Sequence, residues 1–284
     1  MKHIDPTRST DPNYPRATFL SATAAAAAGT ATLGTAFAQS ELGKPHPPLV
    51  PENDPAISIE RIQLQTSGGS IPAYAARPRN ATAATPGVVV VMHIWGVDTS
   101  IRDVVRRLAK AGFSAISPDL YGSLNAPTGD GATDFSVFRP FAQKLQREQT
   151  AGDLRAGAQW IEAQQPSAKI AVLGFCMGGA IALRQTADNA STFAVCAPFY
   201  GAVTGIDPGA VTIPVVGSYG RRDTSIPADA VLAFAKALRV PNDIVEYDDA
   251  GHAFFDDQRA SYVADAAEDS WRRVTAFLTK YLKA

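Results

Sequence analysis

Cys176 stands at the centre of the most specific chemical motif in this sequence. Residues 174–179 read Gly-Phe-Cys-Met-Gly-Gly, which has the G-x-nucleophile-x-G form of a nucleophile elbow with cysteine in the usual serine position. The motif predicts a sharp turn between a buried strand and a helix. The N-terminus of that helix would favour the thiolate, and the amide of Met177 would stabilise an oxyanion at the same place. A cysteine that only packs in the core is the alternative interpretation.

Asp223 and His252 have the residue types and positions that a cysteine nucleophile requires. Each follows directly on a predicted strand, over residues 213–219 and 244–247. Side chains at the carboxyl ends of parallel strands meet at one edge of a sheet. The chain order nucleophile, acid, histidine is that of α/β-hydrolases. A turn-forming aspartate and a surface histidine are the alternatives, but the order and placement favour a catalytic group of three with Cys176.

The elements that must position these residues alternate between strand and helix patterns. Alternating strands and helices predict an α/β fold, with a mostly parallel sheet and helices on both of its faces. The first two strands suggest a hairpin across residues 67–69. The predicted strands cover residues 57–65, 71–77, 87–92, 114–117, 169–174, 193–200, 213–219 and 244–247, and the predicted helices cover residues 98–111, 149–164, a segment from Met177, 228–238 and a long segment ending near Leu282.

Composition and charge exclude several classes of protein. The chain has 26 Lys and Arg against 27 Asp and Glu, so it lacks the basic surface of a nucleic-acid binder. Two cysteines cannot build a disulfide scaffold or a four-ligand zinc site. The 46% hydrophobic and 19% charged residues are typical of a globular domain. No metal-ligand or dinucleotide motif is present, so we predict neither a metal nor another cofactor. The sequence does not indicate the oligomeric state.

The N-terminal 38 residues predict an export signal. Three basic residues precede an uncharged stretch over residues 19–38 that ends in Ala-Phe-Ala, so cleavage is expected before Gln39. Residues 16–20 resemble a twin-arginine motif in which Ala17 takes the place of the second arginine, which leaves the Tat and Sec routes both open. An amphipathic or disordered tail is the alternative interpretation of this region.

Two further regions follow the signal. Residues 39–55 are rich in proline and predict a linker or an extended arm, and residues 56–284 form the predicted catalytic domain. No other apolar run reaches the ~18–20 residues that a membrane helix needs. We therefore expect a mature protein that is exported, to the periplasm, and that does not associate with a membrane.

The chain resembles the dienelactone hydrolase family of the α/β-hydrolase superfamily. The resemblance implies the α/β-hydrolase fold, a Cys176–His252–Asp223 triad, and an oxyanion hole formed by the backbone amides of Ile94 and Met177. It extends over roughly residues 55–284, and the cysteine elbow is its most specific element. The other matching segments are Met-His-Ile-Trp-Gly-Val at residues 92–97, Ser-Pro-Asp-Leu-Tyr-Gly at 117–122, the loops at 220–227 and 250–254, and the closing helix at 262–278.

Two positions depart from the family pattern. Members usually carry glutamate where this chain has His93, and arginine where it has Asp256, four residues after the catalytic histidine. We expect His93 either to pair with the Cys176 thiolate as a cation or to donate a hydrogen bond. Asp256 would repel the carboxylate of a dienelactone, whereas Arg139 and Arg222 are alternative carboxylate ligands that the sequence does not place.

The remaining conspicuous residues have simpler interpretations. Cys196 lies in a predicted strand and is expected to be a buried apolar residue, with a disulfide to Cys176 as the alternative. Trp95 and Tyr121 each follow a predicted strand, where they either line the pocket or cap the core. Asp119 follows a proline at a strand end and is expected to form structural hydrogen bonds.

These residues together predict a hydrolase that works through a thioester. A thiolate is a better leaving group than an alkoxide, so the substrate must itself carry a good leaving group, as lactones of enols and other activated carboxylic esters do. We therefore predict a small-molecule lactone or ester substrate, as for a carboxymethylenebutenolidase. The alternatives are a carboxylesterase or thioesterase with another substrate, and an exported relative that binds ligands or senses thiol oxidation without turnover.

Overall fold

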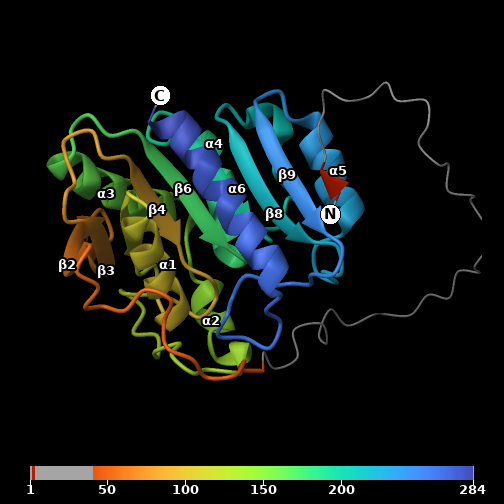
Figure 1. Ribbon diagram of the computed structural model, residues 1–284, viewed down its shortest axis with the longest axis horizontal. Helices are drawn as coiled ribbons and strands as arrows, with labels where there is room; N and C mark the ends of the chain where they lie inside the picture. Colours follow the sequence, from red (N-terminus) through yellow and green to blue (C-terminus); the bar gives the residue numbers. More distant parts are fainter. Residues whose placement is uncertain (1, 4–40, 284) are drawn as a thin grey trace, which may run out of the picture.

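A single mixed β-sheet runs through the molecule, as the computed structural model shows for residues 2–3 and 41–283 (Figure 1). In this part of the chain the sheet has nine strands in the order β1-β9-β8-β7-β6-β4-β5-β3-β2. The strands are β1 (Lys2–His3), β2 (Ile57–Thr66), β3 (Gly69–Pro78), β4 (Gly87–Val91), β5 (Ser114–Pro118), β6 (Ile170–Phe175), β7 (Val195–Phe199), β8 (Val215–Gly220) and β9 (Asn242–Tyr247).

The predicted hairpin at the start of the domain is confirmed. β2 and β3 pair antiparallel along their whole length, from Ile57 opposite Pro78 to Thr66 opposite Gly69. β3 continues the sheet by pairing antiparallel with β5. The alternation of polar and apolar residues in β2 reflects this edge position, because one of its faces meets solvent.

The central strands are parallel, as their continuous apolar runs predict. β4 pairs parallel with β5 and β6, and β6 to β9 pair parallel in sequence across the sheet. Every residue of β4, β6, β7 and β8 is buried, because helices cover both faces. The carboxyl ends of β6, β8 and β9 therefore lie at the same end of the sheet, toward α2 (Figure 1).

Helices pack on both faces of this sheet. α1 and α6 share one face, since the Arg107 guanidinium of α1 lies 4.3 Å from the centre of the Trp271 ring of α6. α3 and α4 pack together, since Asn189 at the end of α4 donates a 2.9 Å hydrogen bond to the Ala151 carbonyl of α3. The helices are α1 (Thr99–Lys110), α2 (Arg139–Ala142), α3 (Arg147–Gln164), α4 (Met177–Asp188), α5 (Ala228–Ala237) and α6 (Ala264–Leu282).

The segment between β5 and α3 contains structure that the sequence did not predict. A short 3₁₀ helix, η1 (Phe135–Val137), and the four-residue α2 follow a long loop. A second 3₁₀ helix, η2 (Pro208–Ala210), precedes β8. Elements of three or four residues are too short to show a hydrophobic period, so only tertiary packing determines them.

The proline-rich region is an extended arm in the part that the structure describes. Leu42 forms an antiparallel bridge with Arg259, and Gly43 N donates a 2.8 Å hydrogen bond to the Gln258 carbonyl. The predicted export signal lies outside the described residues, except for the two residues of β1, which pair with β9. Within the described residues, none of the helices is long and apolar enough to cross a membrane.

Candidate active site

The turn between β6 and α4 holds Cys176 in a strained backbone conformation. Its φ of 55° and ψ of −118° lie outside the regions that most residues adopt. A Cβ on Gly174 would stand 2.1 Å from the Gly178 carbonyl oxygen, and one on Gly178 would stand 2.4 Å from the carbonyl oxygens of Val91 and Met92. Glycine is therefore required at both positions, which explains the spacing of the motif.

The structure brings Cys176, His252 and Asp223 together at the carboxyl ends of β6, β9 and β8. His252 Nε2 lies 3.0 Å from Cys176 Sγ. On the other side of the ring, His252 Nδ1 donates a 2.7 Å hydrogen bond to Asp223 Oδ2. The Asp223 side chain is only 2% exposed. Its second oxygen accepts hydrogen bonds from the backbone N–H groups of Ser225 and Ile226, at 2.8 and 3.1 Å.

The surroundings of the thiol favour a thiolate–imidazolium pair. Burial by itself would raise the pKa of Cys176, but His252, His93 and the backbone N–H of Met177 outweigh burial, so the pKa of this thiol is lowered. Burial also opposes the charge on His252. The negative sulfur and the hydrogen bonds to Asp223 and Cys176 outweigh it and raise the pKa of His252 to about 10.

Backbone strain is concentrated around this pair. Of the described residues other than glycine, Asn125, Cys176, Tyr200 and Ala253 have positive φ. The last three line one cavity. The Tyr200 ring packs 5.2 Å from that of His252. Strain of this kind persists only where the surrounding structure enforces it, which is typical of functional sites.

Ile94 and Met177, the predicted oxyanion-hole residues, both line the cavity that contains Cys176. Tyr121 Oη donates a 3.1 Å hydrogen bond to the Ile94 carbonyl and also lies 3.8 Å from the Met177 sulfur. The His93 carbonyl accepts a 3.1 Å hydrogen bond from Gly96 N, which closes the turn that contains Ile94. Tyr121 therefore connects the two segments that would supply the oxyanion hole.

The cavity around Cys176 has a volume of about 640 Å³, within the ~300–1,000 Å³ common for small-molecule pockets. Its walls come from the loop at residues 92–97, which contains Ile94 and is called the oxyanion loop for its predicted role, and from the α2 segment, the loop after β9 and the N-terminal arm. The residues that line it are mostly apolar, with Glu41 and Arg139 as exposed charged groups. Trp95 lines the cavity as well, whereas Arg222 lies elsewhere on the surface and pairs with Asp249.

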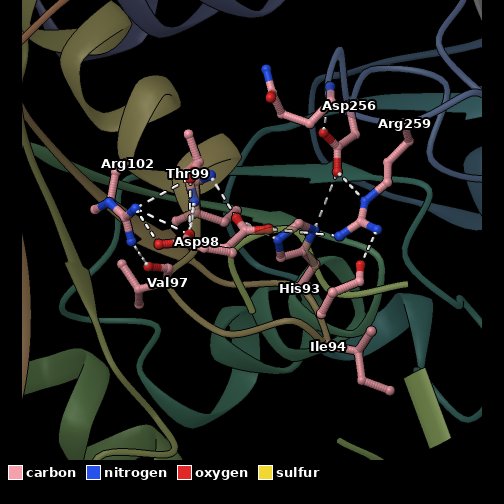
Figure 2. A network of polar contacts seen from close by, with 12 residues as sticks. His93, Ile94, Val97, Asp98, Thr99, Arg102, Asp256 and Arg259 are labelled. Atoms are coloured by element: carbon pink, nitrogen blue, oxygen red, sulfur yellow. Dashed lines mark hydrogen bonds and ion pairs between the residues drawn. The ribbon is translucent and has the colours of Figure 1, made fainter. Parts of the chain in front are cut away.

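A buried cluster of four charged or ionisable side chains lies beside the cavity, and three of them, His93, Asp256 and Arg259, line it (Figure 2). His93 Nε2 donates a 2.9 Å hydrogen bond to Asp98 Oδ1, and His93 Nδ1 lies 3.7 Å from Asp256 Oδ2. Arg259 Nε lies 3.6 Å from the same Asp256 oxygen, and Arg259 Nη2 lies 3.9 Å from Asp98 Oδ2. Asp256, which we expected to repel the carboxylate of a dienelactone, therefore has two basic side chains beside it, His93 and Arg259.

Arg259 and Tyr200 are the site residues that the sequence did not reveal. The Arg259 side chain is 2% exposed, and its guanidinium lies 4.2 Å from the centre of the Trp95 ring. Its Nη1 donates a 2.5 Å hydrogen bond to the Ala132 carbonyl. Arg259 stands only three residues after Asp256, a spacing that could have suggested an ion pair within one turn of chain.

Two residues with simpler interpretations lie where they were expected. Cys196 is fully buried in β7, and both it and Cys176 are free cysteines. Asp119 Oδ1 accepts a 3.0 Å hydrogen bond from Tyr121 N, which fixes the turn after β5.

Comparison with known proteins gives a consistent result. The sequence model described as "Dienelactone hydrolase family" matches residues 71–282. A protein named "Putative carboxymethylenebutenolidase" from Salmonella typhimurium is 36% identical over 250 residues, which cover 83% of this chain and 92% of that protein. A protein of the same name from Escherichia coli K12 is 35% identical over 248 residues, with 82% and 91% covered.

Solved structures agree with this result. A crystal structure titled "Putative Dienelactone Hydrolase" from Klebsiella pneumoniae superimposes with a TM-score of 0.73 at 34% identity, and covers 80% of this chain and 100% of that one. The family match extends over most of the chain and includes Cys176, Asp223 and His252, whereas the arm at residues 41–50 lies before it. The chain therefore belongs to the dienelactone hydrolase family, with the α/β-hydrolase fold that its sheet displays.

Proposed function

We propose that this hydrolase of carboxylic esters and lactones cleaves lactones and activated esters through a thioester on Cys176. The observation that carries the proposal is the unbroken line of contacts from Cys176 Sγ through the His252 ring to the buried Asp223 carboxylate, at 3.0 and 2.7 Å. The line ends in a cavity of small-molecule size. Family membership supports the class of reaction, and the geometry supports the roles of the residues.

In the acylation step, the Cys176 thiolate attacks the carbonyl carbon and forms a C–S bond. The carbonyl oxygen becomes an oxyanion, which the backbone N–H groups of Ile94 and Met177 would stabilise. Removing one such donor typically costs about 10²–10³ in rate. The tetrahedral intermediate then collapses and breaks the C–O bond, and the His252 imidazolium gives its Nε2 proton to the departing oxygen.

In the deacylation step, neutral His252 takes a proton from water, and the resulting hydroxide attacks the thioester carbonyl. The C–S bond breaks, the sulfur leaves as thiolate, and the carboxylic acid product dissociates. Asp223 keeps Nδ1 protonated throughout, because its carboxylate can only accept a hydrogen bond there. The imidazolium–thiolate pair is restored at the end of the cycle.

The chemistry of the first step sets the substrate class. The tetrahedral intermediate expels its better leaving group, and a thiolate leaves more readily than an alkyl alkoxide. An enolate or a phenolate leaves as readily as the thiolate, so enol lactones and aryl esters proceed forward. Alkyl esters and amides return to substrate.

Turnover of a small substrate panel tests this proposal. The panel contains cis- and trans-dienelactone, a neutral enol lactone and p-nitrophenyl acetate, with Cys176→Ala as the matched inactive variant. We expect saturable hydrolysis of the neutral lactone and the aryl ester that disappears in Cys176→Ala, and a mass increase from the acyl group on Cys176 after rapid quenching. A fully reduced protein that hydrolyses none of the panel, or equal rates in the variant, would overturn it.

We also propose that the chain is exported to the periplasm with residues 1–38 as a removable signal and residues 39–55 as an arm outside the catalytic domain. The sequence pattern over residues 1–38 supports this proposal. Cell fractionation followed by N-terminal sequencing tests it: we expect a periplasmic protein that begins at Gln39. Full-length protein found only in the cytoplasm would contradict it.

A further inference from the structure

Three members of the cluster, His93, Asp256 and Arg259, line the same cavity as Cys176, and Asp98 joins them through its hydrogen bond with His93. All four side chains are buried, with exposed fractions of 7%, 5%, 4% and 2% in that order. Figure 2 shows His93 between the two carboxylates, with Arg259 bridging from Asp256 towards Asp98. The cluster joins the oxyanion loop, the start of α1 and the loop after β9.

Charge balance in this cluster depends on His93. With both carboxylates ionised beside one arginine, the buried group would carry a net charge of about −1 unless His93 is protonated. Uncompensated charge is costly at such burial. One additional proton in the cluster would therefore restore neutrality. Both nitrogens of His93 face a carboxylate oxygen, with Nε2 2.9 Å from Asp98 Oδ1 and Nδ1 3.7 Å from Asp256 Oδ2. An ionised carboxylate has no proton to donate, so Asp98 at hydrogen-bond distance and Asp256 at ion-pair distance both favour a protonated ring nitrogen.

We propose that His93 is a permanent imidazolium at neutral pH and acts as a positioning residue that keeps Cys176 ionised in the absence of substrate. The role rests on the proposed function of Cys176 as nucleophile. The charged and titratable groups that face His93 are Asp98 from the start of α1, Asp256 from the loop after β9, and Cys176 from the elbow. The carboxylates outweigh the effect of burial and raise the pKa of His93 above its usual value.

As a consequence, Cys176 is a thiolate before any substrate binds, because charged groups of the protein itself stabilise the negative sulfur. His252 provides one positive charge beside Sγ, and the charge on the buried His93 also lowers the pKa of Cys176. Electrostatic attraction of this kind is long-ranged in a partly enclosed cavity. The charge on His93 should therefore make the potential at Sγ more positive than a neutral side chain at this position would, although Asp256 and Glu41 also line the cavity.

Alkylation of Cys176 with two reagents of similar size measures this potential without any substrate. Iodoacetate is an anion and iodoacetamide is neutral, so the ratio of their second-order rate constants reports the local charge. The second cysteine is fully buried, so modification at Cys176 dominates and is verified by mass spectrometry. His93→Gln removes the charge and keeps hydrogen-bonding capacity. Arg272→Gln, which removes one positive charge from a side chain of α6 that is 73% exposed and does not line the cavity, is the matched control.

We expect His93→Gln to lower the iodoacetate-to-iodoacetamide ratio by about three- to tenfold and to shift the pH profile of alkylation to higher pH. Arg272→Gln should leave both unchanged. A ratio and a pH profile in His93→Gln identical to wild type would overturn the proposal, and would place the extra proton on Asp256. Because alkylation needs no turnover, a failed substrate panel with a lowered ratio would reject only the proposed function.

A second measurement covers the case in which His93→Gln does not fold. Wild-type protein labelled with ¹³C and ¹⁵N in its histidines gives ring signals whose shifts distinguish imidazolium from either neutral tautomer. We expect one buried histidine besides His252 to remain an imidazolium from pH 6 to beyond pH 7.5. A His93 ring that titrates at or below pH 6.5 would overturn the proposal independently of any variant.

Discussion

Replacing Asp223 with asparagine should disable His252 without disturbing its surroundings. Asp223 Oδ1 accepts backbone hydrogen bonds from Ser225 and Ile226, so the asparagine carbonyl must take this position to keep both. The amide NH₂ then lies where Oδ2 stood, 2.7 Å from His252 Nδ1. Two donors cannot face each other, so the ring must carry its single proton on Nε2, toward the sulfur.

The size of the effect follows from two losses. One is the charged hydrogen bond that stabilises the imidazolium, worth about 1.5–3 kcal/mol in typical proteins. The other is the loss of the correct neutral tautomer. A His252 ring that already carries its single proton on Nε2 cannot accept a proton from Cys176 or water at that nitrogen. Together we expect kcat/KM to fall by about 10²–10⁴, equivalent to roughly 3–5 kcal/mol of transition-state stabilisation. The melting temperature should change little, since the backbone hydrogen bonds remain.

The assay is the pH profile of kcat/KM on the best aryl ester from the panel. In the wild type the imidazolium is present below its pKa of about 10, so activity should decline as pH rises through that value. In Asp223→Asn the decline should begin at lower pH, because the stabilising carboxylate is gone. Asp249→Asn is the matched control, since this side chain is 79% exposed and pairs with Arg222. A loss below tenfold with an unchanged profile would refute the reasoning.

Three further variants test how the site is held in place. Gly178→Ala would force a Cβ to within 2.4 Å of two carbonyl oxygens near the end of β4, so unfolding free energy should fall by about 1–3 kcal/mol and activity should be lost, as thermal unfolding and turnover will show. Tyr121→Phe removes the hydrogen bond to the Ile94 carbonyl; kcat should fall about five- to tenfold while the rate of Cys176 alkylation is unchanged, and an unaltered kcat would contradict this role. Gly43→Pro removes the N–H that bonds to the Gln258 carbonyl, so proteolysis within residues 41–50 should accelerate and KM should rise, whereas wild-type values would show that the arm does not shape the cavity.

Local sequence signals were sufficient to predict the framework of the fold. The β-branched run at β4 is wholly buried, and its residues pair with parallel strands on both sides, as such runs predict. Asp98, placed at the first residue of the predicted helix 98–111, is the N-cap of α1 and accepts a hydrogen bond from Ile101 N. The elbow motif could be predicted from the sequence because the fold requires glycine at fixed positions in it. A Cβ on any of its glycines would collide with a backbone atom.

Contacts between distant segments were beyond the reach of such signals. The short helix α2 supplies Arg139 to the cavity but is too brief to show a period. The arm was recognised as extended from its prolines, yet its bridge to Arg259 joins residues more than 200 positions apart. Proline composition limits the conformation of a segment and carries no information about the surface on which it packs.

The interpretation of Asp256 shows why the role of a side chain cannot be predicted from its own sequence position alone. Considered alone, an acid in the place of an arginine indicates repulsion of an anionic substrate. In the structure this acid lies between His93 and Arg259, and His93 is itself the other position that departs from the family pattern. The two positions that depart from the family pattern are therefore in contact in this chain, with His93 Nδ1 3.7 Å from Asp256 Oδ2. At this distance the charge of either side chain alters the pKa of the other, so variants of the two residues have to be interpreted together.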